Sequence, residues 1–180
     1  MRRPSLRLRS LAGGFSLLQV ITATTVVGVL ATAPLPRYGE LQGDARAAKM
    51  KAVAGSLRAA TALAKGQALV NGVDCRSPQG GQVTMEAALI DLMYCAPAAS
   101  ASGIERAANL NSAVDRMIIT HGTRPAPADP AAVVDNPGRS ALRTTIRLAT
   151  ALKPATCLVT YDPPDSAHGA AQVAVVTEGC

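Results

Sequence analysis

The feature that most constrains this chain is a run of nineteen residues, 15–33, without a single charged side chain. As an α-helix this run would be about 28 Å long, close to the hydrocarbon thickness of a bilayer. Basic residues flank it unevenly, because four arginines precede it (Arg2, Arg3, Arg7 and Arg9) and only Arg37 follows closely. This asymmetry predicts a membrane helix with the N-terminus in the cytoplasm and the rest of the chain on the other side.

Polar side chains dilute the run, chiefly Gln19 and four threonines, Thr22, Thr24, Thr25 and Thr32. Threonine hydroxyls can donate to carbonyls of their own helix, which lowers the cost of placing them in lipid. An ordinary secretory signal peptide is one interpretation, with Ala31-Thr32-Ala33 as its cleavage site. The pair Arg2-Arg3 also suggests a twin-arginine signal, but the residues after it fit that signal poorly.

A second interpretation rests on Gly13-Gly14-Phe15-Ser16-Leu17-Leu18, which resembles the class III leader of type IV prepilins. In that family a dedicated peptidase cuts after the glycine on the cytoplasmic side and methylates the new N-terminal residue. A residue without Cβ lets the peptidase approach the backbone closely. The resemblance implies a cut between Gly14 and Phe15, which leaves the apolar run on the mature protein.

The resemblance continues beyond the leader. Counted from Phe15, Gly28 is the fourteenth residue and Pro36 the twenty-second, the positions at which type IV pilins usually carry glycine and proline. The run over 36–46, PRYGELQGDAR, is similar to one in pilins related to the mannose-sensitive haemagglutinin pilus, and 52–58 continues the match. The similarity covers residues 9–71 closely and the remainder loosely.

The resemblance implies three parts: a class III leader over 1–14, a transmembrane or filament-core helix over 15–36, and a globular pilin domain over 37–180. It implies a structural, non-enzymatic subunit of a type IV pilus-like filament, without cofactor or metal. The implied processing residues are Gly14 and Phe15, and the implied assembly residues are Phe15, Gln19, Gly28 and Pro36. The implied partners are a prepilin peptidase, sister pilin subunits, the assembly ATPase and platform, and the inner membrane that holds the subunit before it enters the extracellular filament.

One residue departs from the family pattern. The fifth residue after the cut is Glu in most members and Gln19 here. In the family that Glu is thought to pair with the N-terminal amine of a neighbouring subunit, and some minor or tip subunits lack it. The departure therefore favours a minor or initiating subunit, and drift at a tolerant site is the other explanation.

Two alternatives to a pilus subunit stay open. Within the same class, the chain could be a pseudopilin of a type II secretion system. From a different class, it could be a periplasmic binding or enzymatic domain behind an ordinary signal peptide. The mature N-terminus separates the classes, because methylated Phe15 indicates a pilin and a start near Pro34 indicates a signal peptide.

The chain after the apolar run predicts one long helix followed by short strands. Residues 37–70 are rich in alanine, and we expect a buried stripe of small and apolar residues: Leu41, Ala45, Ala48, Ala52, Ser56, Ala60 and Leu63. Asn71-Gly72 is expected to end the helix, and Gly28, Pro34, Pro36 and Gly39 weaken it over 28–43. With the strands described next, the pattern predicts an α+β fold, a pilin-like roll in which the helix packs on an antiparallel β-sheet.

The expected strands are rich in β-branched residues and lie at 83–85, 116–120, 142–149, 156–161 and 171–176. Ser102-Gly103-Ile104-Glu105 has the pattern of a capping box and predicts a short helix. The proline-rich stretch 124–137 is expected to be an exposed loop.

Four cysteines allow three disulfide pairings and indicate an extracytoplasmic fold. A hairpin between the last two expected strands brings Cys157 and Cys180 together, which leaves Cys75 to pair with Cys95. Pilins similar to this chain also close their C-terminal hairpin with a disulfide. A zinc site is disfavoured, because the chain has no C-x-x-C or H-x₃₋₅-H spacing.

Catalytic and nucleic-acid-binding patterns are absent from the sequence. It contains no G-x-S-x-G, H-E-x-x-H, P-loop or dinucleotide-binding motif. The net charge is +6, but residues 1–14 hold four of the 18 basic residues and none of the 12 acidic ones, so the remainder carries only +2. The chain also has no Trp, one Phe and three Tyr, so its composition argues against a nucleic-acid-binding role.

The remaining polar residues are expected to be solvated. His121 and His168 each lie beside a glycine, so we predict exposed turns for both. Asp162 and Asp165 flank two prolines and are predicted to be solvated turn residues rather than calcium ligands. Arg139, Arg143 and Arg147 should share one face of a strand.

Overall fold

A computed structural model describes residues 16–32, 35–123 and 142–180 of the chain. The predicted leader, Phe15 and the predicted loop at 124–137 lie outside the described residues. The chain divides into two units, residues up to Leu41 and residues from Gln42 to Cys180. The described elements form an α+β fold with N-terminal helices and antiparallel sheets, as expected from the sequence.

Two helices occupy the predicted helical region. Helix α1 spans Leu17–Thr32, and α2 spans Leu35–Val70. Gly28 lies inside α1, so the predicted weakening does not end that helix at the glycine. Pro36 lies in the first turn of α2, where a missing amide hydrogen removes no intrahelical bond. In the part of the chain that the structure describes, no helix combines the length and the apolar character needed to cross a membrane.

Helix α2 ends where Asn71-Gly72 predicted. The amide of Gly72 donates to the Leu69 carbonyl at 3.3 Å, and the amide of Val73 donates to the Ala68 carbonyl at 2.9 Å. These two bonds form a Schellman motif, which needs a left-handed residue after the helix. Gly72 fills that position with φ +66° because it has no Cβ to clash.

The buried stripe of α2 lies on a different face from the one predicted. It consists of Met50, Val53, Ala54, Leu57, Ala60, Ala64 and Ala68. Of the predicted stripe only Ala60 belongs to it, and both leucines are exposed, Leu41 by 61% and Leu63 by 64%. In a helix with alanine on every side, the periodicity of small residues does not identify the buried face. The larger side chains Met50 and Leu57 decide it by packing on the sheets.

A four-stranded antiparallel sheet, β4-β5-β6-β7, covers the middle of this helix. Its strands are β4 (Met117–Thr123), β5 (Leu142–Leu148), β6 (Leu158–Asp162) and β7 (Gln172–Val176). All four strands were predicted within a few residues. The short helix α3 (Ser112–Asp115), which was not predicted, ends at Arg116 in a left-handed conformation, so β4 begins one residue later than expected.

A three-stranded antiparallel sheet packs near the end of α2, against Ala64 and Ala68. Its strands are β1 (Gln82–Met85), β2 (Ala88–Met93) and β3 (Ala96–Pro97), of which only β1 was predicted. Two-residue turns join them, Glu86-Ala87 and Tyr94-Cys95, and all four residues have positive φ. Such turns usually contain Asn-Gly or Gly, and neither signal is present here.

The predicted capping box is wrong in its details. The short helix η1 spans Ala101–Glu105 and is kinked at Gly103, whose φ of −94° and ψ of −107° are not helical. Its N-cap is Ser100, whose hydroxyl accepts a hydrogen bond from the Gly103 amide at 3.0 Å. Ser102 instead donates to a carboxylate oxygen of Asp91 in β2. The Ser102 hydroxyl therefore bonds to the neighbouring sheet, and Ser100 caps the helix in its place. A further short helix, η3, spans Pro154–Thr156 just before β6.

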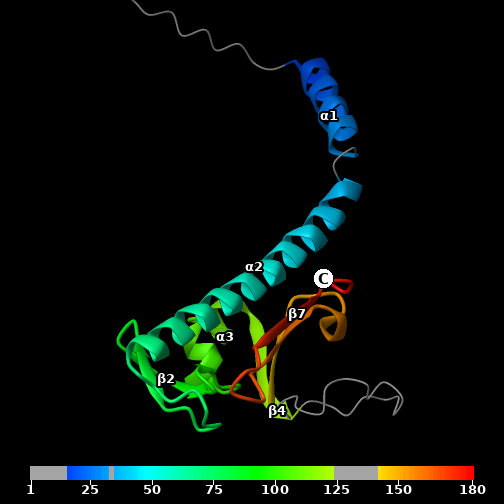
Figure 1. Cartoon of the computed structure of the whole chain (residues 1–180). Coiled ribbons are helices and arrows are strands. Elements are labelled where there is room, and N and C mark those ends of the chain that lie inside the picture. Colours follow the sequence, from blue (N-terminus) through cyan, green and yellow to red (C-terminus); the bar gives the residue numbers. More distant parts are fainter. Residues whose placement is uncertain (1–15, 33–34, 124–141) are drawn as a thin grey trace, which may run out of the picture. The chain divides into compact units, whose positions relative to one another are not determined.

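Two disulfides fasten the unit that begins at Gln42. Cys75 pairs with Cys95 and Cys157 pairs with Cys180, the two pairings expected from the sequence. The first joins the segment after α2 to the turn between β2 and β3. The second joins the start of β6 to the segment after β7. Figure 1 shows both sheets lying along one side of α2 within this unit.

The corrected stripe makes a direct test possible, because Leu57 and Leu63 lie on the same helix. Leu57 is fully buried, so Leu57→Ala should lower the free energy of unfolding by about 2–5 kcal/mol. Leu63→Ala removes the same atoms from an exposed position and should change it by less than about 0.5 kcal/mol. Urea denaturation followed by circular dichroism measures both. An equal loss for the two variants would contradict the assignment of the buried face.

Candidate functional site

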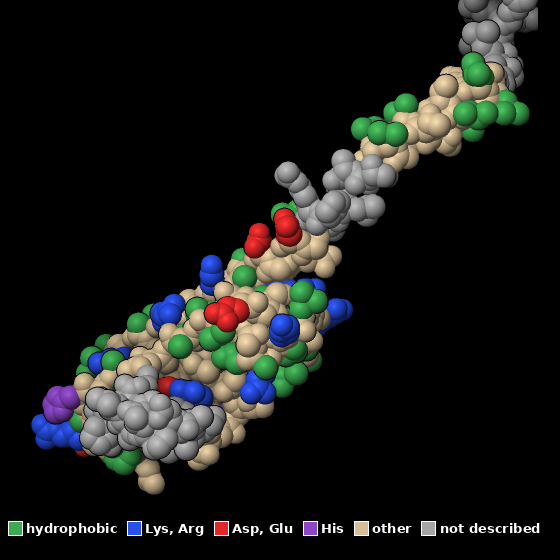
Figure 2. All heavy atoms as spheres, turned by 90° about the vertical axis from the view of Figure 1, so that its right-hand side faces the viewer, with side chains coloured by type: hydrophobic (Ala, Val, Ile, Leu, Met, Phe, Trp, Pro, Cys, Tyr) green, Lys and Arg blue, Asp and Glu red, His purple; other side chains and the backbone are tan. Residues whose placement is uncertain are grey.

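The most unusual surface in the described chain belongs to α1. Eight large apolar side chains of this helix are between 49% and 76% exposed: Leu17, Leu18, Val20, Ile21, Val26, Val27, Val29 and Leu30. Their positions are spread around the whole circumference, so the helix has no polar side. Figure 2 shows this helix with hydrophobic side chains and no charged ones on the face in view. A helix that is apolar all round is stable when lipid or other helices surround it.

Three threonines of α1 donate their hydroxyl groups to carbonyls of the same helix, as predicted. Thr22 donates to the Gln19 carbonyl at 3.0 Å, Thr24 to the Val20 carbonyl at 2.9 Å and Thr25 to the Thr22 carbonyl at 2.9 Å. These bonds leave little unsatisfied polarity on the helix surface. The threonines therefore add less cost in an apolar environment than their number suggests.

Gln19 is different from the threonines. Over residues 17–30, it is the polar side chain that makes no hydrogen bond within the described chain. Its amide carries both donors and an acceptor, and it is exposed on α1. An unpaired amide on an otherwise apolar helix is a specific point for a polar partner.

The other predicted assembly residues fall in separate places. Gly28 lies within α1, and a Cβ built on it would have no heavy atom within 4 Å. Pro36 lies in the first turn of α2, while Gly14 and Phe15 lie outside the described residues. The structure therefore brings Gln19 and Gly28 onto one helix and leaves the processing residues undescribed.

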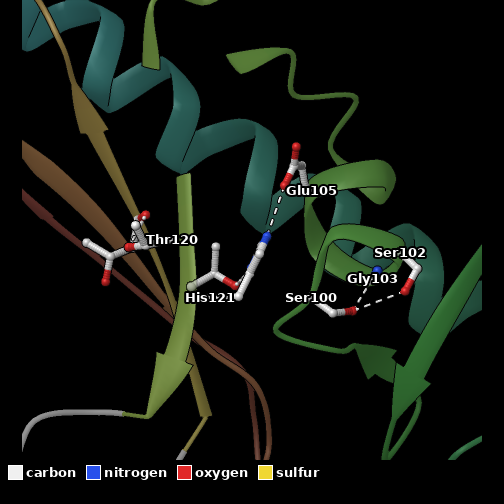
Figure 3. A network of polar contacts seen from close by, with 8 residues as sticks. Ser100, Ser102, Gly103, Glu105, Thr120 and His121 are labelled. Atoms are coloured by element: carbon white, nitrogen blue, oxygen red, sulfur yellow. Dashed lines mark hydrogen bonds and ion pairs between the residues drawn. The ribbon is translucent and has the colours of Figure 1, made fainter. Parts of the chain in front are cut away.

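In the unit from Gln42 onward, a polar network surrounds His121. His121 is exposed, as predicted, but it lies in strand β4 and not in a turn. Its Nε2 atom is 2.9 Å from Glu105 Oε2, and its Nδ1 atom is 2.9 Å from Thr144 Oγ1. Figure 3 shows Glu105 and His121 pointing toward each other from η1 and β4. The network joins η1 to the four-stranded sheet. His168 does lie in an exposed turn, as expected.

Asp162 is not a solvated turn residue. Its side chain is 6% exposed, and both carboxylate oxygens accept hydrogen bonds from Arg143, each at 2.7 Å. The two residues are directly opposite each other in β5 and β6, next to the pair Thr144 and Tyr161. The hydrogen bond with Asp162 raises the pKa of the Arg143 guanidinium. The sequence contained this signal, because aligning the two strands as a hairpin places Arg143 beside Asp162.

Arg143 and Arg147 share one face of β5, as predicted, and Arg139 lies outside the described residues. Tyr161 faces the opposite side and is fully buried. Its hydroxyl donates to the Pro97 carbonyl at 2.6 Å, and burial raises its pKa above the usual range for tyrosine. This bond joins the two sheets through β6 and β3.

Among the described residues, no group of three or more His, Cys, Asp or Glu side chains is placed to hold a metal ion. The four cysteines are committed to disulfides. Comparison with known proteins adds no assignment, because no family model, curated protein or solved structure matches the chain.

The ion pair of Arg143 and Asp162 gives a second prediction. Asp162→Asn should destabilise the fold by about 2 kcal/mol, because it leaves a guanidinium facing a neutral amide. The loss should be smaller than for a fully buried pair, since 23% of the Arg143 side chain is exposed. Asp165→Asn is the matched control and should change stability by less than about 0.5 kcal/mol. If thermal unfolding gave the same midpoint for Asp162→Asn and the wild type, the pair would have no structural role.

Proposed function

We propose that this chain is a structural subunit of a type IV pilus-like filament, matured by a prepilin peptidase and assembled through α1. The observation that carries the proposal is the exposed, charge-free surface of α1, which starts three residues after the predicted cut between Gly14 and Phe15. A surface of this kind needs an apolar environment, and a bundle of apolar helices from neighbouring subunits supplies one.

The unit from Gln42 onward supports the same proposal. A helix packed on a four-stranded antiparallel sheet, followed by a disulfide at the last hairpin, agrees with the pilin-like roll that the sequence resemblance implies. Two disulfides also suit an oxidising compartment. We therefore propose that this unit lies in the periplasm before assembly and on the outside of the filament afterwards.

Assembly would exchange lipid around α1 for neighbouring helices. Lipid tails are as apolar as a leucine side chain, so the hydrophobic effect adds little to the free energy of this exchange. The free energy comes from close packing of the helices and from polar contacts between them. Gly28 offers a point of close approach, because no neighbouring atom of the described chain lies near its absent Cβ. Gln19 offers the polar contact, because its amide has no partner in the described chain.

Gln19 also bears on the place of the subunit in the filament. Its amide oxygen can accept a hydrogen bond from the N-terminal ammonium of a neighbouring subunit, but it brings no opposite charge. A charge pair would be stronger between dry, packed helices. We propose a minor or tip subunit, because a subunit at the end of the filament needs one such contact fewer.

Maturation tests the leader directly. Gly14→Val should abolish cleavage, because a β-branched side chain blocks the approach to the peptide bond. Gly13→Val, one residue further from the cut, should still be processed. Mass spectrometry of the wild-type protein should find a chain that starts at methylated Phe15. Normal processing of Gly14→Val, or a chain starting near Pro34, would contradict the proposal.

The role of Gln19 can be measured in filaments sheared from cells. The chain should be a small fraction of the filament, and Gln19→Glu should not raise that fraction. Gln19→Leu removes a hydrogen bond to a charged group, worth about 1.5–3 kcal/mol, and should lower incorporation about tenfold or more. Quantitative proteomics gives the fractions, with the mature chain in the membrane as the control for processing. This chain as the dominant component would refute the minor-subunit role.

A further inference from the structure

A cavity of about 290 Å³ lies beside α2 in the unit from Gln42 onward, and we call it the α2–β7 pocket. Helix α2, the turn before β3 and the connection from β6 to β7 form its walls. The residues that matter for its chemistry are Arg58, Thr61, Lys65, Tyr94, Pro164 and Val173. Its volume is at the lower end of the range for small-molecule sites.

The basic side chains come from one flank of α2. Arg58, Thr61, Ala62 and Lys65 follow the helical spacing of three, four and seven residues, so they lie on one face beside the buried stripe. Among the lining residues there is no aspartate or glutamate to neutralise the two cations. The pocket therefore favours an anionic ligand.

Arg58 is held in position for such a ligand. Its Nη2 atom donates to the Val173 carbonyl in β7 at 3.0 Å, which fixes one side of the guanidinium. A guanidinium has five N–H donors in total. The other N–H groups of the Arg58 guanidinium make no hydrogen bond within the described chain. A guanidinium that is fixed in position and has free N–H groups can donate to both oxygens of a carboxylate.

Lys65 and Tyr94 bring further unpaired groups to the same cavity. Neither the Lys65 ammonium nor the Tyr94 hydroxyl has a partner in the part of the chain that the structure describes. Tyr94 is half-buried and lies in the turn where it and Cys95 have φ of +49° and +62°. Such backbone conformations are unfavourable for residues other than glycine, and here the Cys75–Cys95 disulfide fastens the turn. The turn thus places Tyr94 in the wall of the pocket.

The size and walls of the pocket favour an organic molecule over an inorganic ion. Arg58 and Lys65 lie about 10 Å apart along the axis of α2, so the pocket between them has room for a ligand with several polar groups. Small apolar side chains line the space between, including Ala62, Ala96 and Ala171. These surfaces suit the carbon skeleton of a ligand, and the Tyr94 ring can pack against its C–H groups.

We propose that the α2–β7 pocket binds a small organic acid, with Arg58 and Lys65 pairing with carboxylate oxygens and Tyr94 packing on the carbon skeleton. A sugar acid and an acylated acidic amino acid both present this chemistry. The proposal goes beyond filament assembly and does not depend on it, because every contact lies in the unit from Gln42 onward.

The test uses the purified full chain in detergent micelles and isothermal titration calorimetry. The probes are glucuronate for the sugar source and N-acetylaspartate for the amino-acid source. Their neutral counterparts are methyl glucoside and N-acetylasparagine amide, and inorganic phosphate is a fifth probe. At least one carboxylate probe should bind saturably, with a dissociation constant of about 1 mM or tighter. If glucuronate binds more tightly, the ligand is a sugar acid, and if N-acetylaspartate binds more tightly, it is an acylated amino acid. Equal dissociation constants support recognition of the carboxylate alone.

Variants locate the binding in the pocket. Lys65→Gln should weaken the carboxylate probe about tenfold, since it removes a charged partner that has no structural contact. Lys51→Gln is the matched control, because Lys51 is exposed on the same helix and does not line the pocket. Equal unfolding midpoints for both variants exclude a loss of structure. The proposal fails if neither carboxylate binds, if phosphate or the neutral counterparts bind as tightly, or if Lys51→Gln weakens binding as much as Lys65→Gln.

Discussion

The packing of one face of α2 on two separate sheets is the interaction on which the rest of the globular unit depends. The three-stranded and four-stranded sheets share no strand pairing, and each buries its apolar side chains against a different stretch of the helix. Helix α2 therefore completes the apolar core of both sheets. The bond from the Tyr161 hydroxyl to the Pro97 carbonyl is a direct link between them.

The division of the chain into two units follows from where α2 packs on the sheets. The cores are formed by residues from Ala47 onward, whereas α1 has an apolar surface that its own unit leaves exposed. Stability of the globular unit and the chemistry of α1 are therefore set by different residues. Substitutions at Gln19 or Gly28 can change what α1 contacts without changing the core around Leu57. This separation is what allows assembly and folding to be tested with different variants.

How far the sequence predicts the structure depends on how much each element relies on distant contacts. The strands of the larger sheet were predictable, because their β-branched residues favour extended backbone wherever they pack. Strands β2 and β3 were not, because Tyr94-Cys95 forms a tight turn that only the surrounding structure stabilises. The apolar surface of α1 was readable from its composition. The Arg143–Asp162 pair was missed because Asp162 was assigned to a turn, although the register of β5 and β6 implies the pair. The α2–β7 pocket was missed because it depends on helix packing.

The two disulfides also set how the globular unit responds to a pulling force. Each closes a loop that cannot be drawn out while the bond is intact, with a sequence separation of 20 for Cys75 and Cys95 and of 23 for Cys157 and Cys180. At about 3.4 Å per extended residue, the two loops withhold roughly 150 Å of contour length. Strands β6 and β7 lie inside the second loop, so a load applied along the backbone passes through its sulfur atoms and leaves that hairpin unstretched. The unit is thus least extensible within these two disulfide-closed loops, whatever the load does to α2.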